Sequence, residues 1–162
     1  MYFKQSDFFA GMAHLFVKEL MERAEKTAYE AGDLIFREGD PTRYFFILIK
    51  GHIKLTIGDE VHTVFVINRP GECFGWSSLV NRSSYSASAV CVAPTNLMRL
   101  DKTHFRATLK NHPADGLLFM ERVAGIIGDR LLNSYRTLAS LTTLASHPTE
   151  GTGQVQEVLE LA

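Results

Sequence analysis

The chain of 162 residues has the length of about one domain, and its 46% hydrophobic and 22% charged residues indicate a packed core rather than a disordered chain. A net charge of −1 and the lack of any lysine and arginine block exclude the broad basic face of a direct nucleic-acid binder. No apolar run reaches the ~18 residues of a membrane span, and the first residues lack the layout of a signal peptide, so we expect a cytoplasmic protein without a membrane segment.

The first segment predicts an N-terminal helix over residues 6–26. Its apolar residues recur three and four positions apart, which is the spacing of one face of a helix. Ser6 or Asp7 is a candidate N-cap, because short polar side chains accept hydrogen bonds from the first free N–H groups. The apolar residues of this face are Phe8, Met12, Leu15, Phe16, Leu20 and Ala24.

Residues 27–101 alternate short β-rich runs with Gly, Pro, Asn and Asp breakers, which is typical of strands joined by tight turns. Strands at this spacing, with no helix between most of them, predict a mainly β fold built as an eight-stranded antiparallel barrel or jelly roll. Cys73 and Cys91 lie in apolar runs, and we expect buried thiols rather than a disulfide or redox pair. The runs are TAYE, LIFRE, YFFILIK, HIKLTI, VHTVFVI, ECFGW, YSASAVCV and TNLMRL.

Residues 102–145 predict two helices, a short one that Asp101 caps and a long one that Pro113 opens. The long helix carries a seam of residues that alternate three and four positions apart, which is heptad spacing and favours a homodimer through the 113–145 helix. The alternative is that this face packs on the barrel. The seam consists of Leu117, Met120, Ala124, Ile127, Leu131, Ser134, Leu138, Leu141 and Ala145. Residues 146–162, rich in Gly, Pro and Thr, are expected to form a flexible tail.

Three stretches carry a resemblance to a known family: YEAGDLIFREGDPTRYFFILIKGHIKL (29–55), PGECFG (70–75) and APTNLMRLDKTHFRATLKNHP (93–113). With the order helix, eight strands, short helix and long helix, they are similar to the cyclic-nucleotide-binding domain of the catabolite-activator and fumarate-nitrate-regulator superfamily. The resemblance covers about residues 8 to 145. It implies a sensor domain over 1–145, with an N-terminal helix (6–26), a jelly-roll barrel (27–101) and C-terminal helices (102–145).

The resemblance also implies a ligand pocket whose two defining groups are replaced. In members that bind cyclic AMP or cyclic GMP, the Phe-Gly pair is followed by a Glu that binds the ribose, and later by an Arg that pairs with the cyclic phosphate. Here the Glu position holds Trp76 and the Arg position holds Tyr85. The implied ligand-binding residues of this degenerate phosphate-binding cassette are Phe74, Gly75, Trp76, Ser77, Ser78, Arg82, Tyr85 and Ser86.

These two replacements weaken cyclic-nucleotide binding. Each hydrogen bond to a charged group contributes ~1.5–3 kcal/mol, and a buried phosphate without a countercharge costs more. Together the changes remove ~4–6 kcal/mol, which turns a micromolar site into a millimolar one. We therefore expect no cofactor, and cyclic AMP or cyclic GMP bound far below ordinary affinity.

Two alternatives stay open at this pocket. Arg82 either replaces the missing phosphate-binding cation or is a solvated loop charge. Trp76 and Tyr85 either line a slot for an aromatic ligand or fill a vestigial cavity. A metal site is not expected, because His52 and His62 lack the close pair with a further acid and histidine that a cupin-type centre needs.

We expect a non-enzymatic regulatory domain that senses a small ligand other than a cyclic nucleotide and signals through the long helix to a dimer or a protein partner. The alternative is a ligand-free interaction scaffold with a vestigial pocket, and a cupin-type enzyme ranks third. Direct DNA binding is not expected, because only residues 146–162 follow the long helix and they contain no helix-turn-helix pattern.

Overall fold

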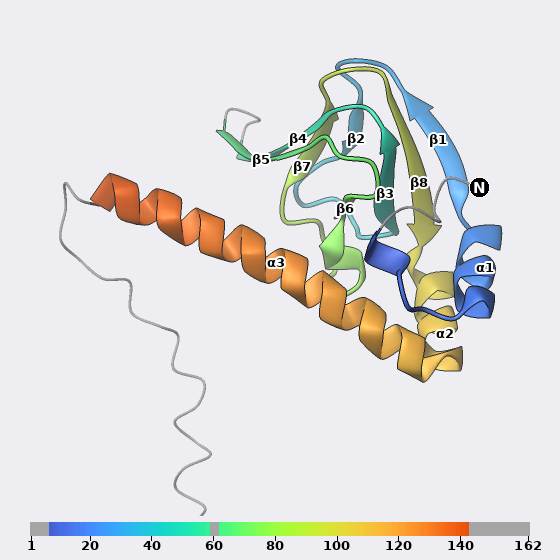
Figure 1. The fold of residues 1–162 in the computed structure, drawn as a ribbon. Helices are drawn as coiled ribbons and strands as arrows, with labels where there is room; N and C mark the ends of the chain where they lie inside the picture. Colours follow the sequence, from blue (N-terminus) through green and yellow to red (C-terminus); the bar gives the residue numbers. More distant parts are fainter. Residues whose placement is uncertain (1–6, 59–61, 143–162) are drawn as a thin grey trace, which may run out of the picture. The chain divides into compact units, whose positions relative to one another are not determined.

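The computed structural model describes residues 7–58 and 62–142, and its strands form two antiparallel four-stranded sheets (Figure 1). One sheet has the strand order β1-β8-β3-β6 and the other the order β2-β7-β4-β5. The predicted mainly β, jelly-roll-like class and its eight strands are confirmed, although the strands pair into two sheets rather than one closed barrel. The strands are β1 (Glu25–Tyr29), β2 (Leu34–Phe36), β3 (Tyr44–Lys50), β4 (Ile53–Ile57), β5 (His62–Ile67), β6 (Cys73–Phe74), β7 (Ser88–Cys91) and β8 (Thr95–Asp101).

Strand β3 separates two apolar layers, because successive side chains of a strand point to opposite faces. On one face, Phe45 stacks on Phe105 at 5.7 Å and meets Phe119 edge-on at 5.9 Å, so helices cover this side of the sheet. On the other face, Phe46 and Leu48 belong to the core between the two sheets. Cys73 and Cys91 are each 1% exposed, and the prediction of buried thiols is confirmed.

The predicted helix over 6–26 is wrong in its extent. The chain instead forms a 3-10 turn, η2 (Asp7–Phe9), and a separate helix α1 (His14–Glu22), and β1 already begins at Glu25. Gly11 breaks the helix, because its φ of 78° lies in the left-handed region. The N-cap residue Ala13 has no capping side chain, and its N–H donates instead to the Asp115 carboxylate at 2.8 Å. Ser6, one of the two predicted caps, lies outside the described residues.

The two C-terminal helices are α2 (Lys102–Asn111) and α3 (Pro113–Thr142). The Asp101 carboxylate accepts hydrogen bonds from the N–H groups of Thr103 and His104, so the predicted cap is confirmed. Residues up to Arg122 and residues from Val123 onward form two compact units. The predicted end of the long helix (143–145) and the predicted tail (146–162) lie outside the described residues. Within the described part of the chain, no helix is both long and apolar enough to cross a membrane.

Candidate functional site

The turn after β6 has the tight geometry that the sequence predicts around the Phe-Gly pair. Gly75 has a φ of 80°, and a Cβ atom there would lie 3.0 Å from the carbonyl oxygen of Tyr44 and 3.1 Å from the Phe46 ring. Glycine is therefore required by both conformation and space. The chain then forms a short 3-10 helix, η3 (Trp76–Ser78), and the Ser78 hydroxyl donates to the Gly75 carbonyl at 2.8 Å.

Tyr85 lies in the core between the two sheets. It is 5% exposed, and its ring stacks on Phe36 with centroids 3.9 Å apart and planes 15° apart. The phenol oxygen accepts from the N–H groups of Tyr44 (2.9 Å) and Arg43 (3.3 Å), and the hydroxyl donates to the Tyr44 carbonyl at 2.8 Å. One donor and two acceptor positions are all that a phenol offers, so its hydrogen-bonding capacity is used.

The pKa of Tyr85 is raised, and burial of the hydroxyl is the largest cause, while the hydrogen bonds from the two backbone N–H groups lower it. The neutral phenol is therefore the favoured form. A neutral, saturated hydroxyl offers no positive charge to a phosphate, unlike the arginine that the resemblance places here. At this position the side chain behaves as a core residue.

Trp76 and Tyr85 do not form a common slot, which corrects the hypothesis that they line one aromatic pocket. The Trp76 ring lies 5.5 Å from Phe45, on the face of β3 that the helices cover, whereas Tyr85 lies on the opposite face with Phe36 and Phe46. Phe45 and Phe46 are consecutive residues of one strand, so their side chains point in opposite directions.

The predicted serines Ser77 and Ser86 lie close together at the turn, and Arg82 is exposed. Ser77 and Ser78 are buried and Ser86 is exposed, and the Ser77 and Ser86 hydroxyls lie 3.5 Å apart. Arg82 is exposed, and the described residues include no hydrogen-bond partner for its guanidinium group. Its carbonyl oxygen, however, accepts a hydrogen bond from the Thr42 hydroxyl at 2.9 Å. The predicted Phe74 joins the core cluster beside Tyr85.

Three residues hold the loop of residues 82–85 in place, and no local sequence pattern indicates them: Phe36, Thr42 and Tyr44. They contact the loop of residues 82–85 from a segment some 40 positions earlier in the chain. The backbone adds two further hydrogen bonds of 2.9 Å. The N–H of Gly39 donates to the Tyr85 carbonyl, and the N–H of Tyr85 donates to the Asp40 carbonyl. Only the pairing of distant strands brings these groups together.

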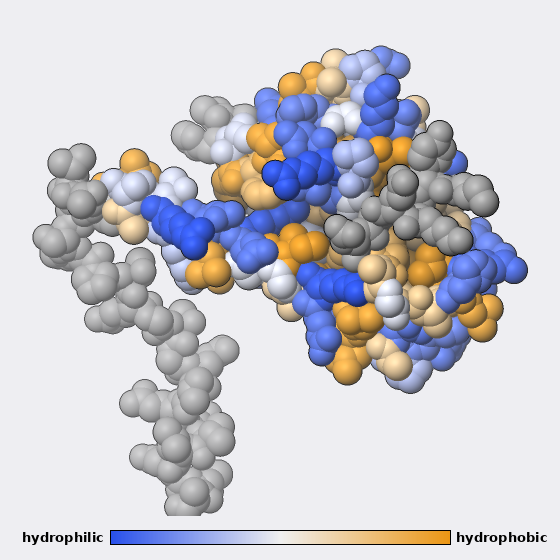
Figure 2. Space-filling view, viewed as in Figure 1, coloured by the Kyte–Doolittle hydropathy of each residue, from blue (hydrophilic) through white to orange (hydrophobic). Residues whose placement is uncertain are grey.

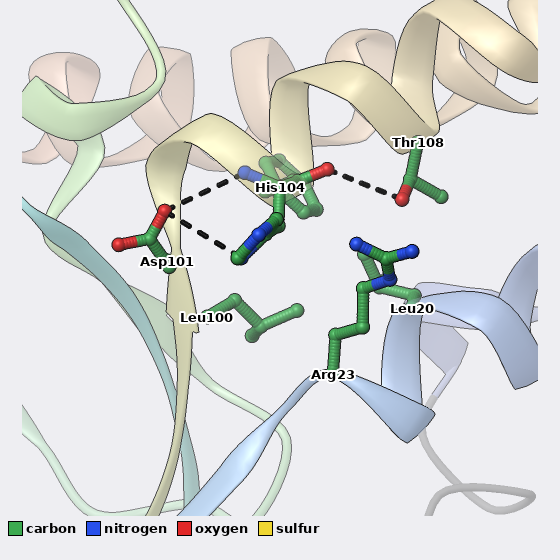
Figure 3. Close-up of a pocket in the computed structure, with 7 residues that line it drawn as sticks. Leu20, Arg23, Leu100, Asp101, His104 and Thr108 are labelled. Carbon is green, nitrogen blue, oxygen red and sulfur yellow. Dashed lines mark hydrogen bonds and ion pairs between the residues drawn. The ribbon is translucent and has the colours of Figure 1, made fainter.

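A small cleft lies between α1, the end of β8 and α2 (Figure 3). Leu20 and Leu100 form part of its wall, and Arg23 and His104 lie at its rim, with His104 bonded to Asp101 and Thr108. The wall residues Leu20, Leu100 and Phe105 are 2–3% exposed, so little apolar surface is open to a ligand. This cleft lies on the helix-covered side of the sheet, away from the core that contains Tyr85.

Two jelly-roll sheets, a Phe-Gly turn and a following short helix define a domain of the cyclic-nucleotide-binding type. A sequence model of the cyclic nucleotide-binding domain matches residues 26–112, which is more than half of the chain, and the chain therefore belongs to this family. The predicted family is confirmed.

Known relatives agree with this assignment. The cyclic AMP receptor protein of Thermus thermophilus is 29% identical over 131 residues, which is 79% of this chain and 58% of that protein. A cyclic nucleotide-binding protein from Geobacter metallireducens has a crystal structure that matches with a TM-score of 0.69 at 27% identity, over 77% of this chain and 92% of that chain. A cyclic nucleotide-binding domain from Methylobacillus flagellatus shares the fold, with a TM-score of 0.73 at 21% identity, over 90% and 79% of the two chains. The chain spans 58% or less of the length of the first curated relatives it matches.

Proposed function

We propose that this chain is a non-enzymatic regulatory domain of the cytoplasm, over residues 1–145, that binds cyclic AMP and cyclic GMP far more weakly than ordinary members of its family. Tyr85 fills the position that the resemblance gives to the phosphate-binding arginine. The domain passes its signal through α3 to a second copy of the chain.

The burial of Tyr85 carries the proposal. To admit a cyclic phosphate at this position, the ring would have to leave its stack on Phe36, and the phenol would have to give up its bonds to Arg43 and Tyr44. Such a move exposes a large aromatic side chain and leaves buried backbone groups unpaired, each at a cost of ~1–3 kcal/mol. The neutral Tyr85 side chain itself supplies no positive charge to the phosphate.

The apolar stripe of α3 supports pairing with a second copy. Leu117, Leu131, Leu138 and Leu141 are 63%, 48%, 55% and 65% exposed, and Ile127 is 37% exposed. Hydrophobic and hydrophilic residues are interspersed along α3 in Figure 2. Large aliphatic side chains exposed at heptad spacing are typical of a helix that pairs with another helix.

Titration calorimetry with cyclic AMP and cyclic GMP up to millimolar concentration tests the nucleotide part of the proposal. We expect no saturation below about 1 mM, because the site lacks ~4–6 kcal/mol of ordinary contacts. The Thermus thermophilus receptor, measured in parallel, controls for the quality of the nucleotides. Saturable micromolar binding to this chain would overturn the proposal.

A second candidate function is sensing of a different small ligand at the outer edge of the same turn. It is supported by the hydroxyls of Ser77 and Ser86, which lie 3.5 Å apart, and by the exposed Arg82 four positions before Ser86 in the chain. Native mass spectrometry of the purified protein tests it: a bound small molecule that is lost in both Ser86→Ala and Arg82→Gln variants would favour this function, and bare protein mass would count against it.

A further inference from the structure

Lys102 occupies an unusual position at the start of α2. It is the first residue of the helix, where the positive end of the helix dipole disfavours a cation. Its side chain is half-buried, and its ammonium group donates to the Thr42 hydroxyl at 3.1 Å. In residues 7–58 and 62–142, Lys102 forms no ion pair. The polar contact of its ammonium group is therefore with a neutral hydroxyl.

Thr42 links Lys102 to the candidate turn. It is 3% exposed, its hydroxyl donates to the Arg82 carbonyl at 2.9 Å, and its N–H donates to the Ser83 carbonyl at 2.9 Å. A hydroxyl has one proton and two lone pairs, so it donates to Arg82 and accepts from Lys102 at the same time. The result is a directed chain of hydrogen bonds from Lys102 through Thr42 to the loop of residues 82–85.

The backbone reinforces this chain at both ends. The N–H of Lys102 donates to the Arg43 carbonyl at 2.8 Å, and the next two N–H groups of α2 are capped by Asp101, as Figure 3 shows for His104. Arg43 in turn donates through its N–H to the Tyr85 phenol at 3.3 Å. The first turn of α2 and the loop of residues 82–85 are thus both hydrogen-bonded to the same two residues, Thr42 and Arg43.

We infer that Thr42 and Lys102 are positioning residues that couple the loop of residues 82–85 to the start of α2. When the loop moves, its hydrogen bond to the Thr42 hydroxyl moves Thr42 with it. The hydrogen bond between Thr42 and the Lys102 ammonium group then transmits this movement to the first residue of α2. The regulatory meaning of this coupling rests on the proposed function of the turn.

Amide hydrogen exchange, read at single residues, tests the coupling in the full-length chain. The reporters on the loop side are the amides of Thr42 and Tyr85, and those on the helix side are the amides of Thr103 and His104. We expect Lys102→Met and Thr42→Val each to speed exchange about fivefold at both sets, because loss of a hydrogen bond of ~1 kcal/mol raises local opening by that factor. The double variant should exchange no faster than Thr42→Val, since both changes break one chain.

Two control variants separate coupling from ordinary destabilisation. Thr42→Ser keeps the hydroxyl and should retain wild-type protection at all four amides. Lys110→Met removes an exposed lysine from the other end of the same helix and should change none of them. The inference is overturned if Lys102→Met affects only the helix amides, or if Thr42→Ser behaves like Thr42→Val. Micromolar nucleotide binding would refute the proposed function and leave these exchange results unaffected, so the two can fail separately.

Discussion

At the residue scale, Tyr85 makes core contacts at a position to which the resemblance assigns a ligand contact. The resemblance assigns an arginine to this position, and an arginine would need an anion or water for its five donors. A tyrosine of similar reach stacks on Phe36 and uses its hydroxyl on the backbone of Arg43 and Tyr44.

Tyr85→Phe tests the contribution of the hydroxyl. The variant keeps the stacked ring but leaves the N–H of Tyr44 without its partner, so we expect a loss of about 1–3 kcal/mol in the free energy of unfolding at pH 7. Urea denaturation of wild type and variant measures it. A variant as stable as the wild type would show that the three hydrogen bonds make no net contribution to the free energy of unfolding.

The same pair of proteins has a defined pH dependence. Burial raises the pKa of Tyr85 above its ordinary value of 10.0. Above pH ~10 the unfolded chain loses this proton before the folded protein does, so the unfolded state binds fewer protons and wild-type stability falls by up to ~1.4 kcal/mol per pH unit. Phenylalanine cannot titrate, and the stability advantage of the wild type should therefore shrink as the pH rises above about 10 towards the raised pKa of the folded protein. A constant difference would contradict the assigned burial.

Gly75→Ala tests the close approach of the turn to β3. The added Cβ would lie 3.0 Å from the Tyr44 carbonyl at a φ of 80°, so we expect a loss of about 1–3 kcal/mol in the free energy of unfolding. Gly125→Ala is the matched control, because no atom lies within 4 Å of the place that a Cβ would take at this helical glycine, and the change should gain ~0.5–1 kcal/mol in helix propensity. Equal effects of the two changes would refute the steric account.

At the element scale, α3 has more apolar surface than a solvated helix needs. Its exposed leucines include both seam residues, such as Leu131, and residues beside the seam, such as Leu132 at 52%. Heptad spacing distinguishes the two sets: position 131 belongs to the predicted contact between chains, and position 132 lies one residue outside it.

Leu131→Asp should therefore weaken self-association, and Leu132→Asp should not. Burial of a leucine is worth ~1.5–3 kcal/mol, and a symmetric dimer loses two of them, so we expect at least about 100-fold weaker pairing for Leu131→Asp. Sedimentation velocity across a concentration series measures this change. The dimer proposal is refuted if the wild type is monomeric throughout, or if both variants shift the equilibrium equally.

At the scale of the whole molecule, the domain has the fold of its family, and Tyr85 belongs to the core between its two sheets. The sheet β1-β8-β3-β6 has an apolar layer on each face. Helices pack over Phe45 on one face, and the core that contains Phe46 lies on the other. The candidate turn contacts both layers, through Trp76 on the helix side and Tyr85 in the core. A single turn is therefore in a position to affect the helices and the sandwich together.

The sequence by itself determined the strands, the turn and the start of each C-terminal helix, because these depend on neighbours in the chain. A run of aromatic and aliphatic residues between turn residues marks strands such as β3, Gly75 marks the turn, and Asp101 and Pro113 mark helix starts. Only the tertiary structure decided where the helix at the N-terminus breaks, which face Trp76 takes, and that Phe36, Thr42 and Tyr44 hold the loop of residues 82–85. Those outcomes depend on contacts between segments some 30 or more positions apart, for which local spacing has no signal.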